Sequence, residues 1–193
     1  MNVLVISDEA NKKRLGHEIE VRVLNYFQKE TMNLTHLSVK KDDLNYCVGC
    51  FGCWVKTPGL CVFDDFGRRL NKHFVESDYV IILTPVVYGC YSTAIKRVLD
   101  RTVPNILPFF KIINNEVHHA PRYDHYPQLI ILGYGEDITE SEEKTFRALT
   151  QANAINFQLD KAKTFMSRRK EDIDQLMNDF TNDLGRSEKG VAV

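Results

Sequence analysis

Four of the five cysteines fall within fifteen residues, and this is the least random feature of the sequence. They are Cys47, Cys50, Cys53 and Cys61, and they are separated by Gly49, Gly52 and Gly59. Glycines at such spacing allow a chain to fold several thiolates around one centre. Four thiolates suit an iron–sulfur cluster or a four-cysteine zinc site, and the absence of two separated pairs favours iron–sulfur. The alternative is that some of them are small buried apolar side chains.

A second candidate site is the segment that follows the most apolar run of the chain, and it comprises Pro85, Val86, Val87, Tyr88 and Gly89. It ends a predicted strand and leads into a predicted helix, so its backbone N–H groups could meet a ligand. The aromatic ring of Tyr88 could stack on a planar ligand, while Gly89 permits close approach. An ordinary strand–helix turn would also need a proline and a glycine.

A third candidate is the loop after the first apolar run, where a phosphate could bind at a helix N-terminus. Its polar and cationic candidates are Ser7, Asn11, Lys13 and Arg14. Asp8 and Glu9 in the same loop would repel a dianion, so an ordinary helix start explains the segment equally well.

The remaining polar clusters carry less information. His118, His119 and His125 lie in a long segment without periodicity, where surface placement is more plausible than metal binding. Asp65 and its neighbour Asp64 are more plausible as a helix cap than as an acid–base pair, because adjacent residues on a helix do not face each other. The aromatic pair Phe51 and Trp54 is expected to pack the cysteine segment against the body of the protein or a neighbouring subunit.

Apolar runs alternate with amphipathic segments along the chain. Strands are predicted at residues 3–6, 34–39, 79–83, 128–132 and 163–166, with Pro85 ending the third. Helices are predicted at 13–28, 64–75, 92–100, 141–153 and 170–184, and residues 102–127 are predicted to be an elaborated loop.

This alternation predicts an α/β fold with a doubly wound, five-stranded parallel sheet, flavodoxin-like, with strand order 2-1-3-4-5. Ligands of such sheets bind beyond the carboxyl ends of strands 1 and 3, where the order reverses. Residues 1–185 are expected to form one domain, and 186–193 a disordered tail.

Composition narrows the class of protein. The net charge of −1 gives no indication of a nucleic-acid partner. No stretch approaches the roughly 18 consecutive apolar residues of a membrane span, and the N-terminus does not resemble a signal peptide. A cytoplasmic location is therefore expected, in which the cysteines stay reduced.

The sequence resembles a known family at this point. The stretch from Cys47 to Trp54, followed by Cys61, is similar to the cysteine-containing branch of the NADPH-dependent FMN reductase superfamily, close to the iron–sulfur flavoproteins. Residues 84–89, with Ile95, Lys96, Asp100 and Arg101 after them, are similar to that family's flavin loop and the helix that follows.

The resemblance implies noncovalent FMN, NAD(P)H as substrate, and a homodimer or homotetramer in which a neighbouring subunit helps to cover the flavin. Pro85 to Gly89 would line the flavin ring, and Gly133, Tyr134 and Gly135 would approach its other side. Ser7 and the residues up to Arg14 would hold the phosphate. The spacing of the four cysteines also lies within that of family members whose four cysteines ligate a 4Fe–4S cluster.

Three functions follow as hypotheses. The first is an FMN-dependent oxidoreductase that passes electrons from NAD(P)H to an unidentified second acceptor. The second is an electron carrier with FMN and a 4Fe–4S cluster. The third is a flavodoxin-like protein that has lost its flavin and serves as a metal-binding or interaction module, and the acidic Asp8 and Glu9 favour it.

Overall fold

The computed structural model describes residues 1–11, 15–30 and 32–190. Its strands are β1 (Asn2–Asp8), β2 (Asn33–Val39), β3 (Tyr79–Val87), β4 (Cys90–Tyr91), β5 (Ile106–Ile113), β6 (Glu116–Pro121), β7 (Gln128–Tyr134) and β8 (Lys163–Ser167). Its helices are α1 (Leu15–Lys29), α2 (Gly52–Val55), α3 (Phe66–Glu76), α4 (Thr93–Asp100), α5 (Glu140–Asn156) and α6 (Ile173–Gly190), with 3₁₀ turns η1 (Glu9–Asn11), η2 (Val103–Asn105) and η3 (Lys170–Asp172).

The main sheet has the order β2-β1-β3-β7-β8, and all of these neighbours pair in parallel. This is the predicted 2-1-3-4-5 order, with β7 and β8 as its fourth and fifth strands. The doubly wound fold is therefore confirmed, and the carboxyl ends of β1 and β3 lie side by side at the point where the strand order reverses.

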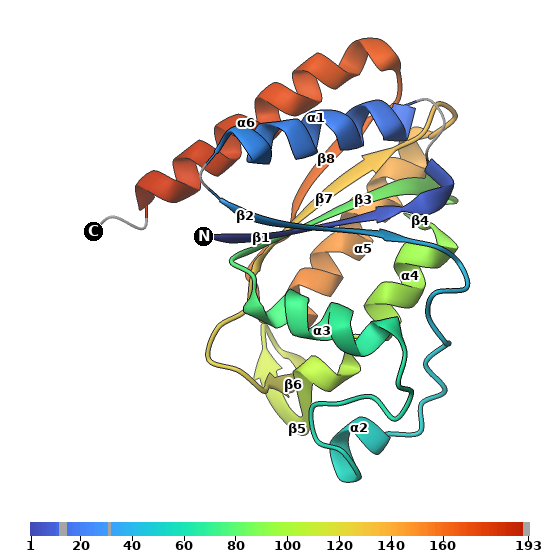
Figure 1. The fold of residues 1–193 in the computed structure, drawn as a ribbon, viewed down its shortest axis with the longest axis vertical. Helices are drawn as coiled ribbons and strands as arrows, with labels where there is room; N and C mark the ends of the chain where they lie inside the picture. Colours follow the sequence, from blue (N-terminus) through green and yellow to red (C-terminus); the bar gives the residue numbers. More distant parts are fainter. Residues whose placement is uncertain (12–14, 31, 191–193) are drawn as a thin grey trace.

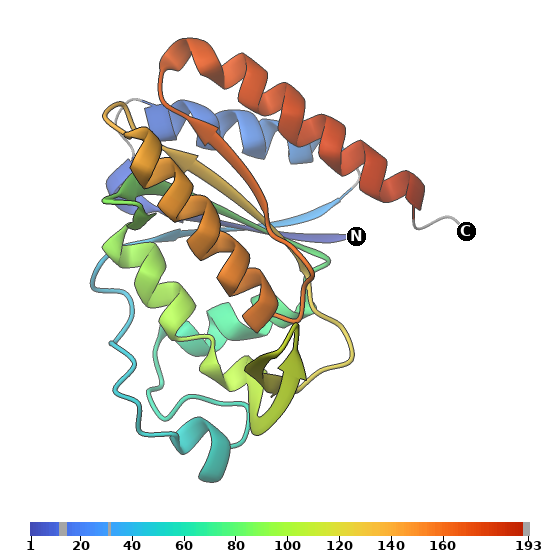
Figure 2. The same ribbon diagram turned by 180° about the vertical axis from the view of Figure 1, so that it is seen from behind.

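Helices cover both faces of the sheet (Figures 1 and 2). One apolar core joins the sheet to α1 and α6, and a second joins it to α3, α4 and α5. Successive residues of a strand point to opposite faces, so the apolar run Val80–Leu83 supplies both cores at once. This two-sided burial explains why the central strands have continuous apolar sequences.

The prediction of an elaborated loop at residues 102–127 is wrong for most of its length. It contains η2 and a hairpin of β5 and β6, joined at Asn114 and Asn115. Both asparagines have positive φ, 51° and 65°, which is the geometry of the tight turns that match strand twist. Pro108 and a register shift between Ile106 and Phe110 interrupt the alternation that would have marked a strand.

The hairpin and α2 lie together at one end of the molecule, beyond α3 and α4 (Figures 1 and 2). At the other extreme of the chain, α6 continues to Gly190, past Leu184, where the sequence predicts the helix to end. Within the described ranges, none of the helices is both long enough and apolar enough to cross a membrane.

Candidate functional site

The end of β3 forms a hairpin at the carboxyl edge of the sheet. The prediction that Pro85 ends this strand is wrong, because β3 continues to Val87. Pairing with β1 stops at Leu83, and Pro85 lies opposite Tyr134 in the last β3–β7 pair. The missing N–H of proline is therefore tolerated at the margin of the ladder. Beyond it, Val86 and Val87 pair with β4 in antiparallel fashion.

Tyr88 and Gly89 make the two-residue turn of this hairpin, with φ of 52° and 73°. A Cβ on Gly89 would lie 2.9 Å from Cβ of Thr145 and 3.1 Å from the carbonyl oxygen of Glu142, so the turn is seated closely on α5. The ring of Tyr88 is instead 90% exposed. The turn therefore presents an aromatic side chain to solvent at the edge where ligands of this fold bind.

The segment Gly133–Gly135 lies beside this hairpin. A Cβ on Gly133 would meet Sδ of Met166 and the ring of Phe146 at 2.8 Å, so only glycine fits there. The Tyr134 side chain, predicted to approach a flavin ring, is buried and lies against Gly16 of α1. The two glycines lie close to the hairpin, since a Cβ on Gly133 would lie 3.1 Å from Cγ2 of Val86 and one on Gly135 would lie 3.8 Å from the Val86 carbonyl oxygen.

The described residues of the first loop are bonded within the protein. Ser7 is buried, and its Oγ lies 3.0 Å from Nε2 of His36. Asp8 accepts a hydrogen bond of 2.9 Å from the Ala10 N–H, and Glu9 accepts one from the hydroxyl of Ser38. Asn11 ends η1, and the predicted phosphate cations Lys13 and Arg14 lie outside the described residues.

A buried polar cluster under α1 was not apparent from the sequence. Nε2 of His36 lies 3.1 Å from Oε1 of Glu20, a buried carboxylate, as well as close to Ser7. Burial raises the pKa of Tyr134 far above its ordinary value, and the negative charges of Asp8 and Glu20 add to the shift. The pattern was hidden because Glu20 and Tyr134 occupy positions that periodicity assigns to an apolar core.

The four cysteines that the sequence analysis singled out line one cavity of about 150 Å³, together with Arg101. Cys53 is buried, and burial raises the pKa of its thiol, with smaller contributions from Cys61, Cys47 and Cys50. Within the described part of the chain, no three potential ligands converge tightly enough for a single metal ion. A four-iron cluster takes its thiolates on separate iron atoms, so its ligands need only surround a common space.

Backbone geometry bends the cysteine segment around this cavity. Gly49, Phe51 and Gly59 all have positive φ, of 63°, 54° and 85°. A Cβ on Gly52 would overlap Cγ1 of Val62, so glycine there lets the two arms of the segment meet. The interspersed glycines thus serve the folding of the segment, as the sequence indicated.

An ion pair between Asp65 and Arg101 lies next to the cysteine segment. Asp65 caps α3 by accepting a 2.9 Å hydrogen bond from the Gly67 N–H, which confirms the predicted cap. The same carboxylate makes two hydrogen bonds with Arg101, of 2.7 and 2.8 Å. Burial would raise the pKa of Asp65, but the hydrogen bonds from Arg101, Asn45 and Gly67 hold it well below its ordinary value.

Aromatic rings connect the cysteine segment to the β5–β6 hairpin. Phe51 stacks on Trp54 at 5.1 Å, and Trp54 and Phe110 lie 4.8 and 4.9 Å from the ring of His119. Nε1 of Trp54 also donates to the carbonyl oxygen of Ile106 at 2.9 Å. The prediction that Phe51 and Trp54 pack this segment against the body is confirmed, and the body element is the hairpin that sequence periodicity missed.

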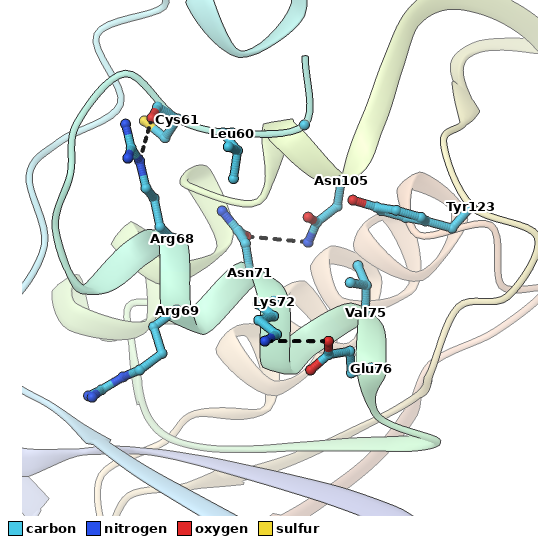
Figure 3. A pocket seen from close by; sticks show the side chains of 11 residues that line it. Leu60, Cys61, Arg68, Arg69, Asn71, Lys72, Val75, Glu76, Asn105 and Tyr123 are labelled. Carbon is cyan, nitrogen blue, oxygen red and sulfur yellow. Dashed lines mark hydrogen bonds and ion pairs between the residues drawn. The ribbon is translucent and has the colours of Figure 1, made fainter. Parts of the chain in front are cut away.

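A wider groove of about 700 Å³ lies on the far side of Cys61, along α3 (Figure 3). Leu60 and Val75 form apolar parts of its lining, and Nε of Arg68 donates to the carbonyl oxygen of Cys61 at 2.9 Å. The groove is thus separate from the β3–β4 hairpin, although it shares Cys61 with the cysteine cavity.

The fold is a doubly wound α/β fold with two candidate sites, the β3–β4 hairpin at the carboxyl edge of the sheet and the cavity lined by four cysteines at the end of α4. Residues 1–119 match the NADPH-dependent FMN reductase family, and the chain belongs to that family. It is therefore related to oxidoreductases that use a flavin, as the resemblance implied.

The chain is also similar to iron–sulfur flavoproteins of two archaea. It is 32% identical over 81 residues to one from Methanocaldococcus jannaschii, covering 42% of this chain and 41% of the relative. It is 41% identical over 69 residues to one from Archaeoglobus fulgidus, covering 36% and 30%. The matches thus span less than half the length of either relative.

Among solved structures, the fold is similar to that of an FMN-dependent NADH-azoreductase from Bacillus anthracis in complex with FMN. The TM-score is 0.65 at 7% identity, and the whole of both chains is covered. At this identity the likeness concerns the flavodoxin-like fold alone.

Proposed function

We propose that this chain is an NAD(P)H-dependent FMN oxidoreductase whose four cysteines hold a second redox group, a 4Fe–4S cluster, and that it passes electrons to a further acceptor. The observation that carries the cluster is the convergence of Cys47, Cys50, Cys53 and Cys61 on one cavity. The similarity to iron–sulfur flavoproteins supports the same assignment.

The flavin ring would lie against the β3–β4 hairpin, lined by Pro85, Val86 and Val87, with Tyr88 and Gly89 at the turn. The exposed ring of Tyr88 and the close approach allowed by Gly135 fit a planar group there. Ser7, Asp8 and Glu9 do not fit the phosphate, because all three are bonded to protein groups and two of them are acidic. Phosphate contacts are therefore assigned to Asn11, Lys13 and Arg14.

Bound FMN would accept hydride from a nicotinamide and release electrons singly or in pairs. The protein would hold the ring at the sheet edge and a cluster beneath it. α4 joins the two, because Ser92 caps it beside the β3–β4 hairpin and Arg101 ends it at the cysteine cavity. Its eight residues at roughly 1.5 Å each span about 12 Å.

We further propose that the protein is a homo-oligomer and works in the cytoplasm. All five cysteines are free, which agrees with a reducing compartment. Several large apolar side chains on the β5–β6 hairpin are exposed, as expected of a surface that a second subunit covers.

The deciding experiment is anaerobic purification, reconstitution with iron, sulfide and FMN, and measurement of the absorption spectrum, iron, sulfide and flavin. We expect flavin bands, a broad additional shoulder and four irons per chain. Cys50→Ser is expected to lose the iron and keep the flavin. Cys90→Ser is the matched control, because Cys90 lies in β4 and does not line the cysteine cavity.

Other results of this reconstitution would support one of the alternative functions. A yellow protein without iron would leave a simple flavin reductase. A folded protein that retains iron or zinc but no flavin would overturn the reductase and leave a metal-binding or interaction module.

A further inference from the structure

Arg101 brings a buried positive charge to the wall of the four-cysteine cavity. Its side chain is 1% exposed, and it is the largest of the fully buried side chains in the described residues. It follows α4 directly and is the C-cap residue of that helix. A buried guanidinium is costly unless it is paired, so its partners indicate its role.

Both terminal nitrogens of the Arg101 guanidinium donate hydrogen bonds within the protein. Nη1 and Nη2 bond the two carboxylate oxygens of Asp65, and Nη1 also donates to the carbonyl oxygen of Asn45 at 2.7 Å. These contacts join residues just before Cys47 and just after Cys61, so Arg101 clamps the two ends of the cysteine segment.

These contacts leave out the third nitrogen of the guanidinium, Nε. Nε of Arg101 is buried and has no hydrogen-bond partner among the residues that the structure describes. The ring of Phe63 lies 5.5 Å from the guanidinium carbon and lines the same cavity. Cys61 and the other three cysteines line this cavity together with Arg101.

We propose that Arg101 is a positioning residue that sets the reduction potential of the four-cysteine centre, with Asp65 as its counterion. This rests on the proposed function. Uptake of one electron, supplied by the nicotinamide through the flavin, adds one negative charge to a thiolate-ligated cluster and breaks no bond. A buried cation and a donated N–H beside the sulfur atoms stabilise the more negative state and raise the potential.

The two members of the pair should act in opposite directions. Removal of the cation in Arg101→Gln leaves the carboxylate of Asp65 alone near the cluster, so the midpoint potential is expected to fall. Removal of the anion in Asp65→Asn leaves the cation uncompensated, so the potential is expected to rise. A merely structural clamp would loosen in both variants and would shift both potentials in the same direction or not at all.

The test is a redox titration of the reconstituted protein, followed by electron paramagnetic resonance of the reduced cluster, with circular dichroism as the check of folding. Arg101→Lys retains the charge and is expected to stay nearer the wild-type potential than Arg101→Gln. Arg69→Gln is the matched control, since it changes the net charge equally on an exposed residue outside the cysteine cavity, and its potential should equal that of the wild type.

The outcomes separate this inference from the proposed function. A wild-type chain that takes up no iron refutes the cluster itself. A wild-type chain with a cluster, whose potential is unchanged or lowered in Asp65→Asn, overturns the role of Arg101 alone. If Arg101→Gln does not fold, the midpoint potentials of Asp65→Asn and Arg101→Lys still test the proposal. The potential should rise in Asp65→Asn and stay near the wild-type value in Arg101→Lys.

Discussion

Tyr88 combines an exposed ring with a backbone conformation that disfavours its side chain. Its φ of 52° lies in the left-handed region, where a non-glycine residue costs roughly 1–2 kcal/mol. Residues kept in such conformations cluster at functional sites. The ring contacts little of the protein, so packing does not explain why a tyrosine occupies this strained position. Contact with a bound ligand would explain it.

We therefore expect Tyr88→Asn to separate stability from binding. Asparagine tolerates positive φ, so the free energy of unfolding should stay level or rise by up to about 1 kcal/mol. Loss of the ring should weaken FMN binding, measured by quenching of flavin fluorescence. Gly89→Ala is the companion variant, and its Cβ would clash with α5, so both stability and flavin binding should fall. Unchanged FMN affinity in Tyr88→Asn would show that the ring does not contact the flavin.

Asp65 predicts an acid-dependent loss of stability. The pKa of this carboxyl is lowered in the folded protein, so its pairing stabilises the fold at pH values above the unfolded pKa of about 4. The stabilisation is lost as the pH falls from there toward the folded pKa. Urea midpoints measured from pH 7 to pH 3 should decline less steeply in Asp65→Asn than in the wild type. Asp64→Asn, at an exposed neighbour, should follow the wild type. Parallel curves for Asp65→Asn and the wild type would contradict this role.

At the scale of elements, sequence patterns predicted those features that depend on local periodicity. The five parallel strands, the helix cap at Asp65 and the strand order all follow from apolar runs and capping residues. The two hairpins were missed for different reasons. Pro85 has the form of a strand terminator but lies where the ladder with β7 ends, and β5 breaks alternation at Pro108.

The candidate site was predictable to a similar extent. Cysteine spacing was sufficient to place four thiols at one cavity, because the glycines between them bend the segment sharply. The roles of Arg101 and His36 were not accessible, since their partners lie 36 and 29 residues away in sequence. Contacts of that kind depend on tertiary packing and leave no local pattern.

The capping box of α5 supports the β3–β4 hairpin. Thr139 accepts a hydrogen bond from the Glu142 N–H, and the Glu142 side chain accepts from the Thr139 N–H at 2.9 Å. The same turn of helix carries the Glu142 carbonyl against which Gly89 is seated. Thr139→Ala should therefore lower the free energy of unfolding by about 1 kcal/mol. It should also weaken FMN retention, because the hairpin rests on this turn.

Chemical denaturation and dialysis against buffer would measure these two effects. Ser141→Ala is the control in the same turn, since Ser141 is exposed and is not the cap. Equal stability of Thr139→Ala and the wild type would mean that the box contributes nothing in the folded protein.

At the scale of the whole molecule, the β5–β6 hairpin leaves several large apolar side chains exposed. A two-stranded sheet alone is marginally stable in water. Phe110, Ile112 and Val117 lie on one face of it, because Phe110 and Ile112 are two residues apart and Ile112 pairs with Val117. Their exposures are 68%, 76% and 69%. An apolar face of this kind is typical of a permanent interface rather than of a transient one.

We expect this face to join two copies of the chain about a two-fold axis, because identical patches are then self-complementary. Lys111 and Glu116 flank the tip of the hairpin, so antiparallel copies could pair opposite charges there. The double variant Ile112→Lys/Val117→Lys buries like charges in such an interface, and light scattering should then show a reduced molar mass. Phe109→Lys is the matched control, since Phe109 is equally exposed at 67% but lies outside the regularly paired residues 110–113, and it should keep the wild-type mass. A monomeric wild-type chain, or a double variant of unchanged mass, would exclude this face as the subunit contact.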